Sequence, residues 1–383
     1  MDRRTGDSNL RLLLNRREAI VAIAAACCAN VDRVRTALAA EPRQESETRA
    51  ESLDWDKSRR EAFAQKELDE YNAVARKNGF PANGRVKTTP RFVVVYNASE
   101  AYAEWVAALA EEVAKGFEKF AVKLGFKRVK LSKPLSIFVF AERALFDAWE
   151  RKLSQPSENE GARQGRSMGF YATGIDRMFV YDQTEIEAYR VATEAQNEKR
   201  PRFTQGRVKR EGRAIMARDG AVFNTSTIAH ELTHQMCYNY GVLRSNGRSP
   251  GWLVEGLATI MEPCDENAAL GWRYRNKPTF NAVRFRGFCD YANYKDGDLR
   301  LVDELVVSDR PIRSLSSDAY CVSWAMAYYC YVKRSKDLAK FIEKCAEKKR
   351  DEIEPGERRR DFVESFGEIE QFKNDFAKFM KSF

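Results

Sequence analysis

The chain of 383 residues contains two histidines, His230 and His234, and they stand four residues apart in the segment His-Glu-Leu-Thr-His. In a helix this spacing places both imidazoles on one face, one turn apart. Glu231 lies roughly 100° further round the helix, beside the pair. Two neutral imidazoles so placed can share a metal ion, while the glutamate reaches a water on that ion. The chain therefore has to fold so that this helix faces a third ligand.

Catalytic zinc takes three protein ligands and keeps a fourth position for water. Glu255 follows His234 after a gap of twenty residues, in the segment Trp-Leu-Val-Glu-Gly-Leu-Ala of a second predicted helix. The sequence thus predicts one Zn²⁺ per chain, bound by His230, His234 and Glu255. The alternatives are two core or surface histidines beside a coincidental Glu231, and a Glu255 that is a partly buried structural acid.

These two segments together resemble the gluzincin metallopeptidases, in particular the peptidase MA-like group of bacterial proteins. The resemblance covers residues 85–383. It implies a hydrolase, an endopeptidase acting on peptide or protein substrates, with zinc on His230, His234 and Glu255. Zinc would lower the pKa of its water to about 7, and Glu231 would accept the water proton and pass it to the leaving amine as the catalytic base and acid.

The chain departs from other branches of these peptidases. A metzincin would have a glycine at position 237 and a histidine at position 240, where this chain has Cys237 and Tyr240. The thermolysin branch has an aspartate four residues after its glutamate ligand, where this chain has Thr259. That branch also stabilises the oxyanion with a later histidine, and this chain has none. The Gly-x-Met-x-Asn motif of zinc aminopeptidases is missing as well, so nothing supports N-terminal trimming.

Without a spare histidine, a tyrosine or an arginine has to stabilise the oxyanion. We expect Tyr320 to be this catalytic group, with core packing as the alternative. Thr259 and Glu262, one and two turns after Glu255, are expected either to orient the ligands or to face solvent. The peptide substrate is expected to add as a strand to a sheet edge at residues 178–182, and a buried edge without function is the alternative.

The hydrophobic pattern predicts an α+β fold, with a zincin-like mixed β-sheet and an active-site helix followed by an α-helical C-terminal subdomain. Residues 92–96 and 135–140 are apolar runs typical of buried strands, and a helix between them makes a β-α-β opening. Residues 169–171 and 178–181 predict a hairpin, which usually lies at a sheet edge.

Asn224 and Thr225 are expected to cap the helix that carries both histidines and ends near Gly241. Residues 252–261 predict the helix that carries Glu255. Residues 55–77 predict a charged helix further upstream. Six cysteines follow residue 39, and either one or two disulfides or buried free thiols are compatible with their wide spacing.

Residues 1–39 are typical of an export signal. Five arginines within residues 1–18 precede an apolar run, and small residues at 37–39 suit cleavage. Arg16 and Arg17 directly before the apolar run resemble a twin-arginine signal. We therefore expect an exported protein, periplasmic or secreted. The alternative is a short amphipathic helix on a cytosolic enzyme.

The predicted domain organisation has a charged linker or helix after the signal, then one metallopeptidase domain. The linker takes residues 40–84 and the domain residues 85–383. Within the domain, residues 85–241 hold the sheet and the active helix, and residues 242–383 hold the third ligand and the helical subdomain. No apolar run approaches the ~18 residues of a membrane-spanning helix.

The formal net charge of +9 is concentrated in one stretch, because residues 199–213 hold seven Lys or Arg and one acid. This stretch is either a lid that contacts acidic substrates or cell-envelope polyanions, or a solvated insertion. Phe203 is its one aromatic residue, so specific nucleic-acid binding is not expected. Two further functions stay open: an inactive binding module with the peptidase fold, and a basic envelope- or polyanion-binding protein whose histidines are incidental.

Overall fold

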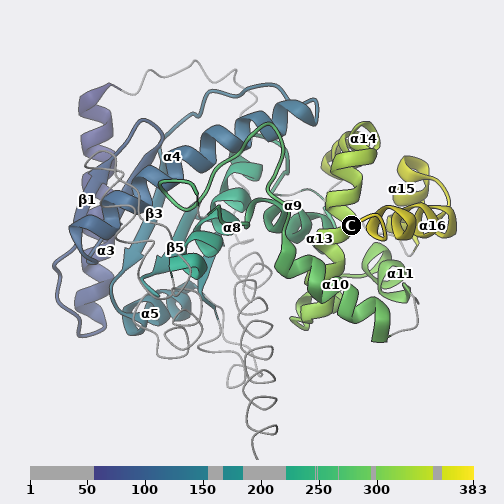
Figure 1. Cartoon of the computed structure of the whole chain (residues 1–383). Coiled ribbons are helices and arrows are strands. Elements are labelled where there is room, and N and C mark those ends of the chain that lie inside the picture. The colour runs from purple at the N-terminus through teal and green to yellow at the C-terminus, as the bar shows by residue number, and fades with distance from the viewer. Residues whose placement is uncertain are drawn as a thin grey trace, which may run out of the picture.

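The computed structural model describes residues 56–153, 167–183, 221–294 apart from 246, 248 and 266, 299–347, and 356–383. One half of the molecule contains a sheet and the helices that flank it, and the other half contains a group of helices (Figure 1). The α+β class predicted from the sequence is confirmed. The predicted export signal and the basic stretch 199–213 lie outside the described residues.

Within the described residues the sheet has five strands in the order β1-β2-β3-β5-β4. The central strands β2, β3 and β5 are parallel, and the outer strands β1 and β4 are antiparallel to their neighbours. The strands are β1 (Arg85–Thr88), β2 (Phe92–Tyr96), β3 (Leu135–Phe140), β4 (Gly169–Ala172) and β5 (Arg177–Tyr181).

Strand β2 is a continuous apolar run and β3 is apolar apart from Ser136, as expected where both faces of the sheet are covered. Helix α4 (Glu100–Lys123) packs on one face, with Phe92, Val94 and Ile137 in its cluster. Helices α3 (Lys57–Lys77) and α5 (Arg143–Leu153) pack on the other face, against Val93 and Val95. The predicted β-α-β opening is therefore present.

The predicted hairpin is also present, but its outer strand is β4. Strand β5 pairs with β3 on one side and β4 on the other, so the expectation of a free edge at residues 178–182 is wrong. Both segments are short and apolar, and their sequences do not indicate which one takes the interior position. Among the described residues, the outer strand on this side of the sheet is β4, residues 169–172.

Helix α3 is part of the packed structure. Asp56 caps its first turn, and Tyr71 stacks on Phe140 of β3 at a ring distance of 5.3 Å. Glu67 forms a buried ion pair with Arg177 of β5, with Arg177 Nε 2.7 Å from Glu67 Oε2. This polar contact fixes α3 on the apolar face that it covers.

Helix α8 (Ala221–Asn239) carries both histidines and is held at its two ends by residues of the hairpin. Near its start, the Asn224 side chain accepts from the Gln183 backbone N–H at 3.1 Å and donates to Asp182 at 3.1 Å. Near its end, Asn239 donates to Asp176 Oδ1 at 2.7 Å. The helix is therefore fixed against the sheet over its whole length.

The sequence prediction for the start of α8 is wrong. Asn224 and Thr225 lie inside the helix, which already includes Ala221, and the Thr225 hydroxyl donates to the Ala221 carbonyl. Asn224 uses its side chain for the hairpin contacts. A close approach to β4 occurs further along, where a Cβ on Gly169 would lie 2.7 Å from Thr227 Cγ2.

The remaining regular elements of the described chain are helices. They are α9 (Gly251–Met261), α10 (Ala282–Tyr294), α11 (Arg300–Val307), α12 (Arg310–Arg313), α13 (Ser317–Lys333), α14 (Ser335–Glu347), α15 (Glu357–Phe366) and α16 (Ile369–Met380). None of the described helices combines the length and apolar character that a membrane crossing requires. All six cysteines in this part of the chain have free thiols.

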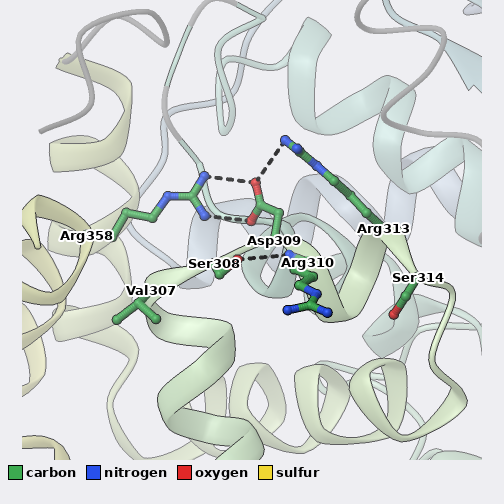
Figure 2. A pocket seen from close by; sticks show the side chains of 7 residues that line it. All are labelled: Val307, Ser308, Asp309, Arg310, Arg313, Ser314 and Arg358. Carbon is green, nitrogen blue, oxygen red and sulfur yellow. Dashed lines mark hydrogen bonds and ion pairs between the residues drawn. The ribbon is translucent and has the colours of Figure 1, made fainter. Parts of the chain in front are cut away.

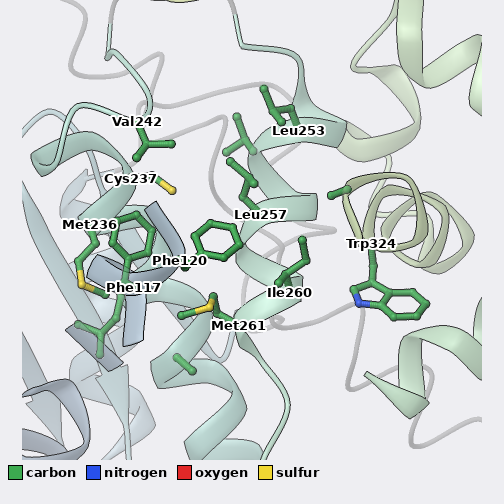
Figure 3. Close-up of a cluster of buried hydrophobic side chains, with 14 of the residues drawn as sticks. Phe117, Phe120, Met236, Cys237, Val242, Leu253, Leu257, Ile260, Met261 and Trp324 are labelled. Atoms are coloured by element: carbon green, nitrogen blue, oxygen red, sulfur yellow. The ribbon is translucent and has the colours of Figure 1, made fainter. Parts of the chain in front are cut away.

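One hydrophobic cluster joins the sheet side to the helical side. Figure 3 shows its centre, where Phe117 and Phe120 of α4 approach Leu257 and Met261 of α9, with Trp324 of α13 beyond. Because α8 and α9 are both part of this cluster, their relative position is fixed by core packing.

Candidate metal centre

Both histidines of α8 are buried, with 0% of the His230 residue and 1% of His234 exposed. One helical turn separates them, and their rings lie 4.7 Å apart, nearly perpendicular. The two Nε2 atoms approach to 3.0 Å. The helix therefore points two nitrogen ligands at one place inside the protein.

Glu255 of α9 completes the group. Its Oε2 lies 3.3 Å from His230 Nε2 and 3.5 Å from His234 Nε2. Ligand atoms about 2.0–2.1 Å from a tetrahedral metal ion are about 3.3 Å from one another. The three separations match this value, so the buried triad of His230, His234 and Glu255 can hold a metal ion.

Glu262, just after α9, sets the proton of the first histidine. Its Oε1 lies 2.8 Å from His230 Nδ1. Guanidinium and imidazole neighbours hold this carboxyl ionised, and an ionised carboxylate only accepts hydrogen bonds. His230 Nδ1 therefore carries the proton, and Nε2 presents its lone pair towards His234 and Glu255. This is the tautomer that a metal ligand needs.

Glu262 is itself held by two residues near the start of α10. Arg284 donates Nη2–H to Oε1 at 2.7 Å and Nε–H to Oε2 at 3.0 Å, and Asn281 donates to Oε2 at 3.1 Å. Burial alone would raise the pKa of Glu262, but the charge of Arg284 and the hydrogen bonds from His230 and Arg284 outweigh it and lower the pKa to about 2.

The sequence predicted Thr259 and Glu262 as possible residues that orient the metal ligands. In the structure, Glu262 contacts the ligand His230. Arg284 and Asn281 were missed. No local signal distinguishes Arg284 from the other arginine of its helix, because its burial depends on the packing of α10 against α13. Thr259 has a different role, since its hydroxyl donates to the Glu255 and Gly256 carbonyls of its own helix.

The carboxyl group of Glu255 is kept ionised. Burial raises its pKa, but the adjacent His234 and His230 outweigh this effect and lower it well below the ordinary value. An ionised carboxylate between two imidazole nitrogens is an oxygen ligand suited to a divalent cation.

Glu231 lies beside the triad and is 1% exposed. Burial raises its pKa to about 8, although His230 partly opposes this shift. The backbone N–H of Tyr171, on edge strand β4, hydrogen bonds to its carboxyl group. Its Oε2 is buried and has no hydrogen-bond partner among the described residues. This oxygen is therefore available for a water or a substrate group.

Tyr320 is buried in α13, with 1% of the residue exposed. Its ring centre lies 5.8 Å from Cζ of Arg284, the arginine that holds Glu262. The structure thus brings His230, Glu231, His234 and Glu255 together, and it places Tyr320 on the side of the residues that support His230. A role for Tyr320 at the oxyanion stays a prediction.

Two contacts position the helix that carries Glu255. Its first N–H, from Gly251, donates to Asp309 Oδ1 at 2.7 Å, whereas Pro250 at the N-cap position provides no side-chain cap. A Cβ on Gly256 would lie 2.6 Å from the Ser323 carbonyl oxygen of α13. The absence of a side chain at this position therefore sets how closely α9 approaches α13.

Part of the chain matches a known protein family. Residues 224–351 match the model of a family described as "Protein of unknown function (DUF1570)". The matched segment begins in the first turn of α8 and includes His230, Glu255 and Arg284. No curated protein matches the chain.

Proposed function

We propose that this protein is a zinc-dependent peptidase similar to the gluzincins. The observation that carries the proposal is the geometry of the triad, together with the contact of Glu262 with His230. Glu262 holds the proton of His230 on Nδ1, so that three buried ligand atoms face one another at 3.0–3.5 Å. These separations are those expected between the ligand atoms around one tetrahedral metal ion.

Two imidazole nitrogens and one carboxylate oxygen suit zinc best among the common ions. Magnesium and calcium prefer sets of oxygen ligands, whereas zinc sites of this composition keep one position open for catalysis. Glu262, held by Arg284 and Asn281, supports the same choice, because a carboxylate behind a ligating histidine orients the ring and raises its basicity.

A bound zinc ion would supply Lewis acidity, polarising the substrate carbonyl and acidifying a water molecule. Glu231 would accept the proton of that water on its unpartnered Oε2 and then donate it to the leaving amine. The substrate peptide would lie along β4, the outer strand among the described residues, whose Tyr171 N–H already contacts Glu231. The protein would then bind its substrate through backbone hydrogen bonds next to the acid/base.

Tyr320 remains our candidate for the oxyanion donor. The neighbouring Arg284 guanidinium favours development of negative charge nearby. Tyr320→Phe is expected to lower kcat on a cleaved peptide while KM and zinc content stay unchanged. Unchanged kcat in this variant would assign Tyr320 to core packing alone.

Zinc content tests the site directly. Purified protein is expected to contain one zinc per chain by plasma emission, and His234→Ala and Glu255→Ala are expected to lose it or bind it much more weakly. Glu304→Ala, an exposed acid on α11, serves as the matched control. A wild-type protein that binds no zinc after reconstitution at neutral pH would contradict the proposal.

Activity separates the enzyme from an inactive binding module of the same fold. A peptide library incubated with wild-type protein is expected to be cleaved, and Glu231→Gln is expected to keep zinc and lose turnover. Absence of cleavage by zinc-loaded wild-type protein would favour the binding module. Deletion of residues 199–213 tests the polyanion alternative. If the protein is a peptidase, the deletion is expected to leave zinc content unchanged. If the protein is a polyanion-binding protein, the deletion is expected to abolish its binding to polyanions.

Export through residues 1–39 is part of the proposal. The arginine-rich start and the apolar run that follows support it. Fractionation of the producing cell is expected to place the chain outside the cytoplasm, shortened at its N-terminus, and Arg16→Lys with Arg17→Lys is expected to retain it inside.

A further inference from the structure

The end of helix α4 and the loop that follows it are strongly basic. Residues 119–133 contain five lysines and one arginine, and neither aspartate nor glutamate. The structure describes the whole of this segment and the chain on both sides of it. The metal ligands are on α8 and α9, so this segment is a separate feature of the protein.

The basic residues of α4 continue into the loop. Lys119 and Lys123 are one turn apart on the solvent-facing side of the helix, and both are exposed. After the helix, the Phe126 N–H donates to the Ala121 carbonyl at 3.0 Å, which holds the chain against the helix end. Residues 127–128, which are also exposed, therefore start beside the last turn and extend the same basic surface.

Four cations of this segment have no carboxylate partner among the described residues. They are Lys119, Lys123, Lys127 and Arg128. Lys123 Nζ lies 4.4 Å from the ring centre of Tyr331, a contact that does not neutralise its charge. Lys133 pairs with Asp176 at 2.9 Å, and Lys130 also interacts with another group of the protein, so neither is counted.

The acid nearest to these cations in sequence is engaged elsewhere. Glu118, directly before Lys119, has its Oε1 2.8 Å from Arg91 Nη2. Figure 2 shows the opposite case at α12, where Asp309 binds Arg358 with two hydrogen bonds of 2.8 Å each. No described carboxylate pairs in this way with the four cations of α4 and its loop.

Two exposed valines lie among these cations. Val122 is 46% exposed and Val129 is 42% exposed, and they are two of the six large apolar residues that are exposed in the described part of the chain. Val122 lies three residues after Lys119, on the same side of α4. None of the aromatic residues in the segment is exposed. We call the resulting surface the α4 patch, formed by Lys119, Val122, Lys123, Lys127, Arg128 and Val129.

We propose that the α4 patch docks the protein on an anionic phospholipid membrane. Clustered lysine and arginine side chains are attracted to anionic headgroups. Exposed aliphatic side chains next to them can enter the boundary between headgroups and acyl chains. Single-stranded nucleic acid is disfavoured, because the surfaces that bind it stack its bases on aromatic side chains. The proposal does not depend on the proposed peptidase activity.

Cosedimentation of the full chain with lipid vesicles tests the proposal. Phosphatidylcholine vesicles with about one-third phosphatidylglycerol are expected to bind the protein at least roughly 100-fold more tightly than vesicles of phosphatidylcholine alone. The triple variant Lys119→Gln, Lys127→Gln, Arg128→Gln is expected to bind the anionic vesicles roughly 100-fold more weakly, since each cation near such a surface contributes a factor of about five. All three side chains are exposed, so the fold is expected to tolerate the change.

A second triple variant is the matched control. Lys66→Gln, Arg76→Gln, Lys77→Gln removes the same charge from exposed positions of α3, which packs on the other face of the sheet. It is expected to change vesicle affinity by less than about two-fold, because salt screens distant charges.

The valines distinguish a membrane from a soluble polyanion. Val122→Ser with Val129→Ser keeps every charge of the patch and is expected to weaken vesicle binding roughly three-fold or more. Binding of polyglutamate and of a single-stranded oligonucleotide is expected to be weaker than binding of vesicles, and to be unchanged in this variant.

Four outcomes would overturn the proposal. Equal binding of anionic and uncharged vesicles would show that headgroup charge is not recognised. Unchanged affinity in the first triple variant would place vesicle binding elsewhere in the chain, and equal losses in both triple variants would show a general charge effect. Tighter binding of polyglutamate or of the oligonucleotide than of vesicles would assign the patch to an acidic protein or to a nucleic acid.

Discussion

Glu262 Oε1 lies 2.8 Å from Nδ1 of His230, and this contact connects the metal centre to α10. The same carboxylate accepts two hydrogen bonds from Arg284 and one from Asn281. All three supporting side chains are buried, so their positions are set by packing. The orientation of the His230 ring is thus determined by residues up to 54 positions away in the chain.

The first prediction concerns this contact. Glu262→Gln is expected to lower zinc affinity about 10- to 100-fold, because the amide is a weaker acceptor for the Nδ1 proton and leaves His230 less basic. Competition with a chromogenic chelator measures the affinity. Glu304→Gln, which changes an exposed residue of α11, is the control and is expected to leave zinc affinity unchanged. Equal zinc affinity in wild type and Glu262→Gln would show that Glu262 does not act on the metal.

The second prediction concerns the approach of α9 to α13. Gly256→Ala adds a Cβ that would lie 2.6 Å from the Ser323 carbonyl oxygen and 2.7 Å from Ala327 Cβ. We expect a loss of about 1–3 kcal/mol in the free energy of unfolding and weaker zinc binding, because α9 must move and it carries Glu255. Urea unfolding measures the first effect. Gly247→Ala, with no atom closer than 3.2 Å, is expected to cost less.

The third prediction concerns pH. Asp309 is desolvated by burial, but its hydrogen bonds and charge contact with Arg358 outweigh this and lower its pKa below the ordinary 3.8. A group with a lowered pKa in the folded state stabilises the protein above its unfolded pKa, and the contribution is lost as the pH falls through the folded value.

The free energy of unfolding of Asp309→Asn should therefore be below that of wild type by a constant amount above about pH 5. The difference should shrink as the pH falls below the ordinary pKa of 3.8. Metal-free protein is used, so that the pH dependence of metal binding does not contribute. A difference that grows towards low pH would contradict the assignment.

The fourth prediction concerns α3. Glu67→Gln leaves Arg177 with one of its two carboxylate partners, since Glu70 still lies 2.6 Å from Arg177 Nη2. Breaking a buried ion pair costs about 3 kcal/mol, and Glu70 is expected to offset part of this. Urea unfolding measures the loss. Glu61→Gln, whose side chain is 67% exposed, should change stability by less than about 0.5 kcal/mol.

Much of the sheet could be predicted from the sequence, because strands covered on both faces are continuous apolar runs. Residues 92–96 are such a run, residues 135–140 are one apart from Ser136, and both are central strands. Strand β1 was missed, since its four residues are partly exposed and lack this pattern. The order of β4 and β5 was also beyond the sequence, because strand pairing is a long-range choice between two similar apolar segments.

At the metal centre, the sequence by itself determined which side chains provide the chemistry. The spacing of His230 and His234 follows from helical periodicity, which is a local property, and Glu255 lies in a recognisable second segment. Tertiary structure alone decided their separations of 3.0–3.5 Å and the proton on His230. It also brought Arg284 to Glu262, because such contacts depend on how helices distant in sequence pack, and no local pattern of residues encodes that packing.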